Sequence, residues 1–333
     1  APLAFTTNLE FKYGLVACYF LAVVVVTRDE ALTWFKGNSR RGWAYGLVAL
    51  VGFMALLRTH DGLSLGRVVH SARSFYGTLC VDELNAADES QQGFALRHGR
   101  VMHGLQFTSP ERRRQPTTYY CPDSGVGIAV ANHPRGLNLR IGVVGLGVGT
   151  IAAYGEPGDY LRFYEINPQV IDAAREHFTF LSDCPATVDV ILGDARLSME
   201  REPAQRFDVL VLDAFSGDAI PTHLLTEEAF AIYLRHLSDD GILALHITNR
   251  HVDLNPVVRG LAQHYRLETL DIETKVDLEQ GVAASAWAIL TRNREFLADR
   301  AVQEAAGASR QQYAAAPYPL WRDDFSNLLE VLR

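Results

Sequence analysis

The chain has 333 residues, of which 48% are hydrophobic and 21% charged, and its formal net charge is -8. This composition fits a packed globular core and excludes a mainly disordered chain. The acidic balance argues against a nucleic-acid partner but suits a cationic small molecule. The 4 cysteines lie far apart with no C-x-x-C spacing, so we expect neither a disulfide framework nor a metal site.

Two uncharged apolar stretches lie near the start, at residues 13–27 and 42–57. Each is slightly shorter than the ~18 residues of a clear membrane span, yet longer than a typical buried strand. Lys12 and Arg28 flank the first stretch, and side chains of this kind can reach out to a membrane surface. We therefore predict transmembrane helices within residues 1–62, with buried core helices as the alternative.

Short alternating segments follow the apolar stretches. Arg67–Glu83, Gly93–His98 and Gly125–Val130 are typical of strands and turns, and they predict a small β-rich domain over residues 63–135. Between them, Ser109–Thr118 is polar and contains three consecutive arginines. We interpret it as an exposed loop, with an anion-binding loop as the alternative.

From Leu139 onward, predicted strands alternate with predicted helices. The expected strands are Leu139–Val144, Tyr160–Tyr164, Val188–Leu192, Phe207–Leu212, Gly241–Ile247, Leu267–Asp271 and Ser285–Thr291, and the expected helices are Pro168–Phe178 and Thr226–Leu237. This alternation predicts a parallel sheet with helices on both faces. The expected fold class is thus α/β, with a Rossmann-like, methyltransferase-like domain over residues 136–333 after the small β domain and the apolar helices.

Polar or glycine residues follow four of the expected strands. Gly145, Glu165, Asp194 and Asp213 each come at or directly after a strand end. Ligands of parallel sheets bind at the carboxyl ends of the strands. We therefore expect these four residues to meet at one edge of the sheet.

The glycine loop after the first of these strands predicts a nucleoside site. Gly145, Gly147 and Gly149 allow a sharp turn and a close approach of the backbone to a ligand, and Glu165 could accept hydrogen bonds from ribose hydroxyls. A dinucleotide-binding fingerprint continues at this point toward a third, more widely spaced glycine, but here Thr150 stands there. This favours an S-adenosylmethionine-type donor over NAD.

Two aspartates extend the predicted site. Asp194, followed by Ala195, could accept a hydrogen bond from an adenine amino group. Asp213 closes the fourth strand beside the expected sulfonium, where a carboxylate could deprotonate an amine or steer a cation. Asp218 lies in a Gly-Asp turn and is either a turn former or a further carboxylate of the site.

Three histidines, His103, His223 and His246, have no metal-ligand spacing. We interpret them as core or surface histidines and expect no metal at this site.

From about Val68 to Thr291 the chain resembles the spermidine/spermine synthase (polyamine aminopropyltransferase) family, and most of all bacterial members in which this domain follows membrane helices. The matching stretches are Ser74–Tyr76, His103–Gln106, the Gly145 loop, Tyr164–Pro168, Gly193–Ala195 and Asp213–Phe230. The family has an N-terminal β domain and a methyltransferase-like α/β domain. It moves an aminopropyl group from decarboxylated S-adenosylmethionine to a polyamine.

The resemblance implies a role for each matched residue. Glu165 would bind the ribose, Asp194 with Ala195 the adenine, and Asp213 would accept the proton of the attacking amine. The residues we assign to the acceptor are Gln106, Tyr119, Tyr120 and Asp218.

Several positions depart from the family pattern. Val148 replaces the aspartate that usually holds the aminopropyl amine, Gly77 replaces a glutamine, and Ser216 stands at the second aspartate of the Asp-Ser-Ser-Asp-Pro motif. Tyr119–Pro122 replaces the Tyr-His-Glu or Tyr-Gln-Glu segment. The adenosine half of the site is thus retained, whereas the polyamine half is largely rewritten. Asp218 or the C-terminal Trp321–Asp324 could supply a replacement carboxylate.

We therefore expect a spermidine synthase-like transferase that uses decarboxylated S-adenosylmethionine. The alternatives are a methyltransferase that uses S-adenosylmethionine itself, and a membrane-tethered module that holds the nucleoside without turnover. The expected partners are a small amine acceptor, a membrane through residues 13–57 and a second copy of the chain, but no nucleic acid. We expect attachment to a bacterial cell membrane with the catalytic domain in the cytoplasm, because the donor is a cytosolic metabolite.

Overall fold

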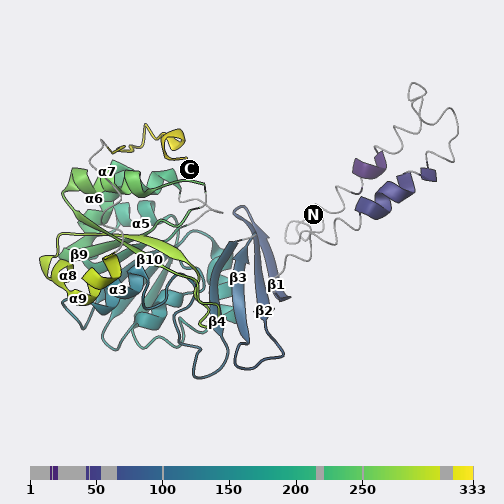
Figure 1. Cartoon of the computed structure of the whole chain (residues 1–333), viewed down its shortest axis with the longest axis horizontal. Coiled ribbons are helices and arrows are strands. Elements are labelled where there is room, and N and C mark those ends of the chain that lie inside the picture. The colour runs from purple at the N-terminus through teal and green to yellow at the C-terminus, as the bar shows by residue number, and fades with distance from the viewer. Residues whose placement is uncertain are drawn as a thin grey trace.

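The structure is a computed structural model with two β-sheets (Figure 1). It describes residues 16, 18–21, 43–44, 46–53, 66–99, 101–214, 221–249, 251–307 and 318–332. A four-stranded sheet comes first along the chain, and a seven-stranded sheet covered by helices follows it.

The first sheet is antiparallel, with strand order β1-β2-β3-β4. Its strands are β1 (Arg67–Ser74), β2 (Gly77–Leu84), β3 (Gly93–His98) and β4 (Val101–Phe107). The segment predicted over Arg67–Glu83 is the β1–β2 hairpin, which turns at Phe75 and Tyr76. β4 was not among the expected strands.

The second sheet has the strand order β10-β11-β9-β8-β5-β6-β7. Its strands are β5 (Arg140–Val144), β6 (Tyr160–Glu165), β7 (Thr187–Leu192), β8 (Phe207–Leu212), β9 (Leu237–His246), β10 (Glu268–Thr274) and β11 (Ser285–Thr291). The expected α/β class is confirmed, with one difference in direction. β11 runs antiparallel to both of its neighbours, so the sheet is parallel only from β7 to β9.

Helices cover both faces of this sheet (Figure 1). One face carries α3 (Gly125–Ala131), α4 (Pro168–His177), α8 (Arg294–Ala298) and α9 (Arg300–Ala306), and the other carries α5 (Ala195–Arg201), α6 (Glu227–His236) and α7 (Asn255–Tyr265). Successive strand residues point to opposite faces. Val143 therefore packs into the first helical layer and Val144 into the second, and both faces of the strands are buried.

Helix α3 corrects the prediction of a strand over Gly125–Val130. The Ser124 side chain accepts a hydrogen bond from the Gly127 amide and so caps the helix. A Cβ atom at Gly125 would lie 2.2 Å from the Cβ atom of Trp287, so glycine permits close packing on β11. α3 packs on β9 and β11 of the seven-stranded sheet, and the boundary at residue 135 stays a prediction.

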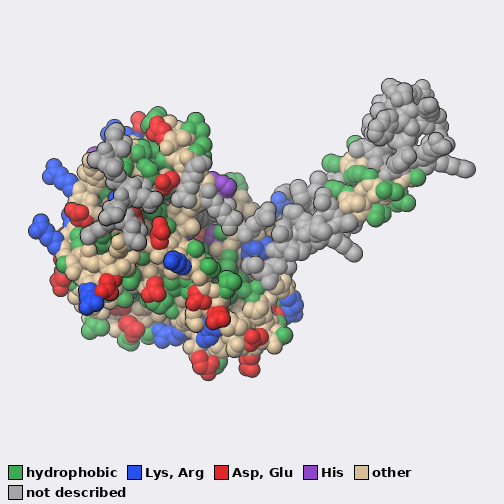
Figure 2. Space-filling view, in the orientation of Figure 1, with side chains coloured by type: hydrophobic (Ala, Val, Ile, Leu, Met, Phe, Trp, Pro, Cys, Tyr) green, Lys and Arg blue, Asp and Glu red, His purple; other side chains and the backbone are tan. Residues whose placement is uncertain are grey.

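The two apolar N-terminal stretches lie only partly within the described residues, where residues 18–21 and 46–53 are helical. Tyr19 stacks on Phe53 at 5.7 Å between ring centroids, and its hydroxyl donates to the Gly46 carbonyl at 2.7 Å. Figure 2 shows apolar side chains gathered on these residues, among them Leu21 and Val48, which are 70% and 72% exposed. Across the described part of the chain, no helix is long and apolar enough to cross a membrane. The rest of the expected spans lies outside the described residues, and the membrane helices stay a prediction.

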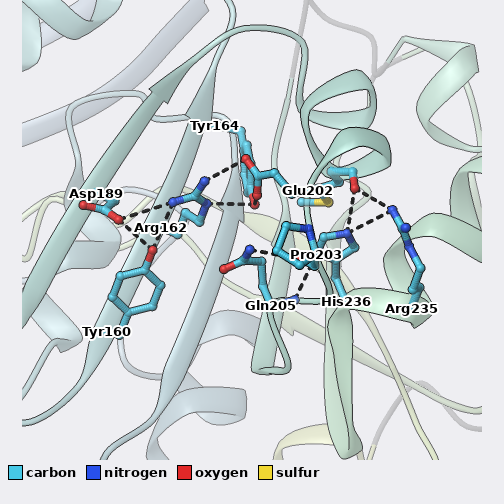
Figure 3. Close-up of polar contacts among 10 residues, drawn as sticks. Tyr160, Arg162, Tyr164, Asp189, Glu202, Pro203, Gln205, Arg235 and His236 are labelled. Atoms are coloured by element: carbon cyan, nitrogen blue, oxygen red, sulfur yellow. Dashed lines mark hydrogen bonds and ion pairs between the residues drawn. The ribbon is translucent and has the colours of Figure 1, made fainter.

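A polar network on β6 holds the sheet against α5 (Figure 3). The Arg162 guanidinium donates to the Tyr164 hydroxyl at 3.1 Å, to Glu202 at 2.7 Å and to the Tyr160 hydroxyl at 3.1 Å. It also forms an ion pair with Asp189 at 3.3 Å. The Tyr164 hydroxyl in turn donates to Glu202 at 3.0 Å, so the network fixes the end of β6, which leads into Glu165.

Candidate active site

A cavity of about 340 Å³ lies at the carboxyl edge of the parallel strands, between the two sheets. The strand-end residues predicted to converge, Gly145, Glu165, Asp194 and Asp213, all line it. Phe75, Tyr76, His98 and His103 line the side that belongs to the four-stranded sheet, and Ala195 and His223 also contribute. One site is thus built from both sheets.

The glycine loop needs glycine at its first two positions. Gly145 has φ +96°, and a Cβ atom there would lie 2.3 Å from the Asp213 carbonyl oxygen. Gly147 has φ +55°, and its Cβ atom would lie 2.7 Å from the His103 carbonyl oxygen. Both line the cavity, whereas Gly149 precedes the 3₁₀ helix η2 (Thr150–Tyr154) outside the lining.

Glu165 is a buried, fixed carboxylate at the end of β6. One of its oxygens accepts a hydrogen bond from the Leu146 amide at 3.0 Å, and the other accepts one from the Asn167 amide at 2.8 Å. Burial raises the pKa of this carboxyl above its ordinary value. The side chain thus ties the glycine loop to the start of α4 while it lines the cavity.

Asp194 combines a structural contact with a place in the lining. Its side chain caps α5 by accepting a hydrogen bond from the Leu197 amide at 2.9 Å. Its second oxygen lies 3.2 Å from Nε2 of His223, which also lines the cavity. The second oxygen therefore remains at the cavity, where a ligand could reach it.

The Asp213 carboxylate is held from behind by two side chains and is only 4% exposed. The Tyr120 hydroxyl donates to one oxygen, and Nδ1 of His246 lies 2.7 Å from the other. Burial and the negative charge of Asp213 raise the pKa of Tyr120 well above its ordinary value. Tyr120 therefore stays protonated and remains a hydrogen-bond donor.

His246 lies between two aromatic rings, with centroids 4.6 Å from Tyr119 and 4.7 Å from Trp287. Its Nε2 is 2.8 Å from the Thr248 hydroxyl oxygen, which itself accepts from the Ala286 amide at 2.8 Å. This pattern indicates that the Thr248 hydroxyl donates to Nε2 of His246 and that the Nδ1–H of His246 donates to Asp213. Because Thr248 is exposed, a continuous polar chain runs from the buried carboxylate to solvent.

This role of His246 was not predicted, although the sequence contains a signal for it. His246 is the last residue of β9, so the strand-end rule that selected Asp213 applies to it as well.

The described residues expected to bind the acceptor lie outside the cavity lining. Tyr119 and Tyr120 lie behind Asp213. Gln106 is buried, and its amide group donates to the Arg113 carbonyl at 2.8 Å and accepts from the Thr179 amide at 2.8 Å. The Gln106 side chain thus joins these two segments, and acceptor binding by these residues stays a prediction. Asp218 and Ser216 lie outside the described residues.

Trp321–Asp324, considered as a source of another carboxylate, lies elsewhere. Trp321 is a packing residue with 1% of its surface exposed. Asp323 pairs with Arg196 at 2.7 Å. No residue of this segment lines the cavity.

Two of the departures from the family pattern have a structural reason. Val148 is fully buried, and a Cβ atom at Gly104 would lie 2.4 Å from its methyl group. A Cβ atom at Gly77 would lie 2.6 Å from Nε2 of His98. Val148 therefore packs on β4, and Gly77 leaves room for His98, which lines the cavity.

No family model matches the chain. It is similar to the polyamine aminopropyltransferase of Vibrio vulnificus, with 28% identity over 203 residues. That match covers 59% of this chain and 64% of the relative, so it spans less than two thirds of the relative's length. A shorter stretch of 109 residues is 35% identical to an N-terminal histidine N-methyltransferase of Emericella nidulans, covering 31% of this chain and 19% of that protein.

Among solved structures, the fold is similar to that of a probable spermidine synthase from Corynebacterium glutamicum. The TM-score is 0.51 at 16% sequence identity, over 75% of this chain and 97% of the other. The likeness predicted from the motifs is therefore confirmed, and the chain resembles the polyamine aminopropyltransferases in sequence and in fold.

Proposed function

We propose that this chain is a polyamine aminopropyltransferase that binds decarboxylated S-adenosylmethionine in the cavity between its two sheets. The observation that carries the proposal is the position of Asp213. This buried carboxylate lies in the same cavity as Glu165 and Asp194, on the next strand from the glycine loop. The name of the Vibrio relative supports the same activity.

The donor would be held by the strand-end residues. Glu165 would accept hydrogen bonds from the ribose hydroxyls, and the Asp194 oxygen that lies beside His223 would accept one from the adenine amino group. Gly145 and Gly147 let the backbone approach the sulfonium end closely. The cavity volume of about 340 Å³ falls at the lower end of the ~300–1,000 Å³ usual for small-molecule sites.

The reaction would be a direct displacement. The acceptor nitrogen attacks the propyl carbon bonded to sulfur, the new N–C bond forms, and the C–S bond breaks with its electron pair going to sulfur. The thioether methylthioadenosine leaves, and Asp213 takes the proton that the nitrogen loses. Because the sulfonium is already an activated leaving group, the protein contributes positioning and proton removal.

His246 would act on this step through Asp213. Its Nδ1–H stabilises the carboxylate and sets its orientation, while Tyr119 and Trp287 keep the imidazole ring in place. The hydrogen bond with Thr248 fixes the other ring nitrogen, so that Nδ1–H keeps facing Asp213. We therefore assign His246 as a positioning residue.

Methyl transfer from intact S-adenosylmethionine is the second candidate, and Val148 is the observation that favours it. A buried valine offers no partner for the donor's amine, and only intact S-adenosylmethionine has a carboxylate by which it could be held instead. His98 and His103, on the other side of the cavity, are compatible with a donor that keeps its carboxylate. The released product would then be S-adenosylhomocysteine.

We also propose that residues 13–57 attach the chain to a bacterial membrane, with the transferase domain in the cytoplasm and a second copy of the chain as a partner. Support for attachment comes from the apolar composition of 13–27 and 42–57 and from the exposed apolar side chains there, such as Leu47 and Val51. In a vesicle flotation assay, the full chain should float and a Val51→Asp variant should float less. Full recovery of the wild-type chain in the dense fraction would contradict attachment.

Calorimetric titration of the full chain with each donor tests the proposed function. Aminopropyl transfer predicts tighter binding of decarboxylated S-adenosylmethionine, and binding should survive in both Asp213→Asn and the exposed control Glu200→Gln. Tighter binding of intact S-adenosylmethionine would favour methyl transfer. Binding of neither donor would contradict both functions.

A further inference from the structure

Outside the donor cavity, two imidazoles and a carboxylate come together from different elements. His70 lies on β1, and Glu176 with His177 closes α4. One potential ligand atom from each residue lies within 4.8 Å of the others. His70 and His177 are far apart in the sequence, so no local spacing could reveal this cluster.

The backbone of β1 presents His70 to this cluster. The β1–β2 register shifts between Val68 and His70, and such bulges re-aim side chains. The His70 ring lies 4.8 Å from the His177 ring between centroids, tilted by 51°.

His177 carries a second, independent observation. Its Nε2 atom is buried, and within the described residues it has no hydrogen-bond partner. A buried polar atom without a partner is unusual in a folded protein. A nitrogen lone pair beside another imidazole and a carboxylate is the arrangement that a metal ion completes.

We propose that His70, Glu176 and His177 form a binding site for one divalent transition-metal ion, with Zn²⁺ as the best match. Two imidazole nitrogens and one carboxylate oxygen suit Zn²⁺, whereas Ca²⁺ and Mg²⁺ prefer sites made of oxygens. Glu176 is exposed, which leaves room for water as a further ligand. The site does not depend on the proposed function, because none of its residues lines the donor cavity.

The position of the site suggests what the ion does. It would join the four-stranded sheet to the end of α4, where the Gln169 side chain already donates to the Arg73 carbonyl at 3.1 Å. β1 leads directly into Phe75 and Tyr76, which line the cavity. The bound ion would therefore hold this hairpin over the donor site.

Zn²⁺ titration of the full chain, followed by calorimetry, tests the proposal. In wild type, the Zn²⁺ ion that binds most tightly should occupy this site. His70→Ala and His177→Ala should each raise the dissociation constant of that ion at least about tenfold. The control His251→Ala, which removes an exposed histidine away from the cluster, should keep wild-type affinity. The two histidines lie on different elements, and Glu176→Gln changes only an exposed side chain. At least one of these variants should therefore fold, and circular dichroism verifies the folding of each.

Two results would overturn the site. One is a wild-type Zn²⁺ affinity that persists in any folded variant of the two histidines. The other is a wild-type chain that binds no Zn²⁺ in a titration carried out at micromolar protein concentration. Co²⁺ gives a second readout, because its visible absorption should appear in wild type and in His251→Ala and be lost in His177→Ala.

Discussion

The two sides of the cavity, which we propose to hold the donor and the acceptor, are built in different ways. On the proposed donor side, Gly145, Asp194 and Asp213 follow strands of the seven-stranded sheet, and Glu165 ends one. On the other side, Phe75, Tyr76, His98 and His103 come from the antiparallel sheet, and their position depends on how the two sheets pack. Topology alone therefore places the first group of residues, whereas packing decides which residues of the second group reach the cavity.

Removal of the Asp213 charge should have the largest effect on activity. Asp213→Asn keeps the shape but loses the base, so we expect kcat to fall by about 10²–10⁴-fold, with donor affinity within a few-fold of wild type. Steady-state kinetics and donor titration measure the two quantities. The exposed Asp239→Asn is the matched control, and full activity in Asp213→Asn would remove Asp213 from the mechanism.

Val148→Asp restores the usual family residue in the glycine loop and tests whether packing against β4 governs this position. The site is fully buried, so an unpaired carboxylate should lower the free energy of unfolding by about 3 kcal/mol or more. Val148→Ala should lower it by only about 2 kcal/mol. Urea denaturation measures both. A stable Val148→Asp variant that prefers decarboxylated donor would show that the position faces the ligand.

Glu165→Gln tests the proposed donor side. Loss of the charged acceptor should raise the donor Kd by roughly 10–100-fold, the equivalent of about 1.5–3 kcal/mol. Because burial raises the Glu165 pKa above its ordinary value of 4.5, wild-type affinity should fall with decreasing pH already above pH 4.5, as the ionised form is lost. Glu165→Gln should lack that pH dependence. Equal donor affinity in the two proteins would place the ribose elsewhere.

His246→Gln should have the smallest effect of the four. Glutamine can still donate a hydrogen bond to Asp213 but does not fill the space between Tyr119 and Trp287, so it holds the carboxylate less firmly. We expect kcat to fall by about tenfold with KM unchanged. Thr248→Val, which removes only the hydrogen bond to Nε2 of His246, should lower kcat by less. An unchanged kcat in His246→Gln would leave His246 with a packing role only.

The parts of the fold that follow from local pattern were predictable. Phe207–Leu212 is apolar except for Asp208 because both of its faces are buried, and it forms β8 with the expected bounds. Helix α4 begins at its proline, as expected. The convergence of the strand-end residues followed from the same pattern.

The remaining parts depend on contacts between distant segments. Gly125–Ala131 alternates like a strand but forms α3, because its glycines fit against Trp287 and Pro122. Gln106 matched a family motif, yet its place outside the cavity depends on Thr179 and Arg113. No sequence pattern contains such contacts.

The most direct test of the central claim is identification of the products by mass spectrometry. The full chain would be incubated with decarboxylated S-adenosylmethionine and putrescine, and separately with intact S-adenosylmethionine and putrescine. We expect equal amounts of methylthioadenosine and an aminopropylated amine in the first mixture, and neither product with Asp213→Asn. S-adenosylhomocysteine and a methylated amine in the second mixture alone, or no product in either, would contradict aminopropyl transfer.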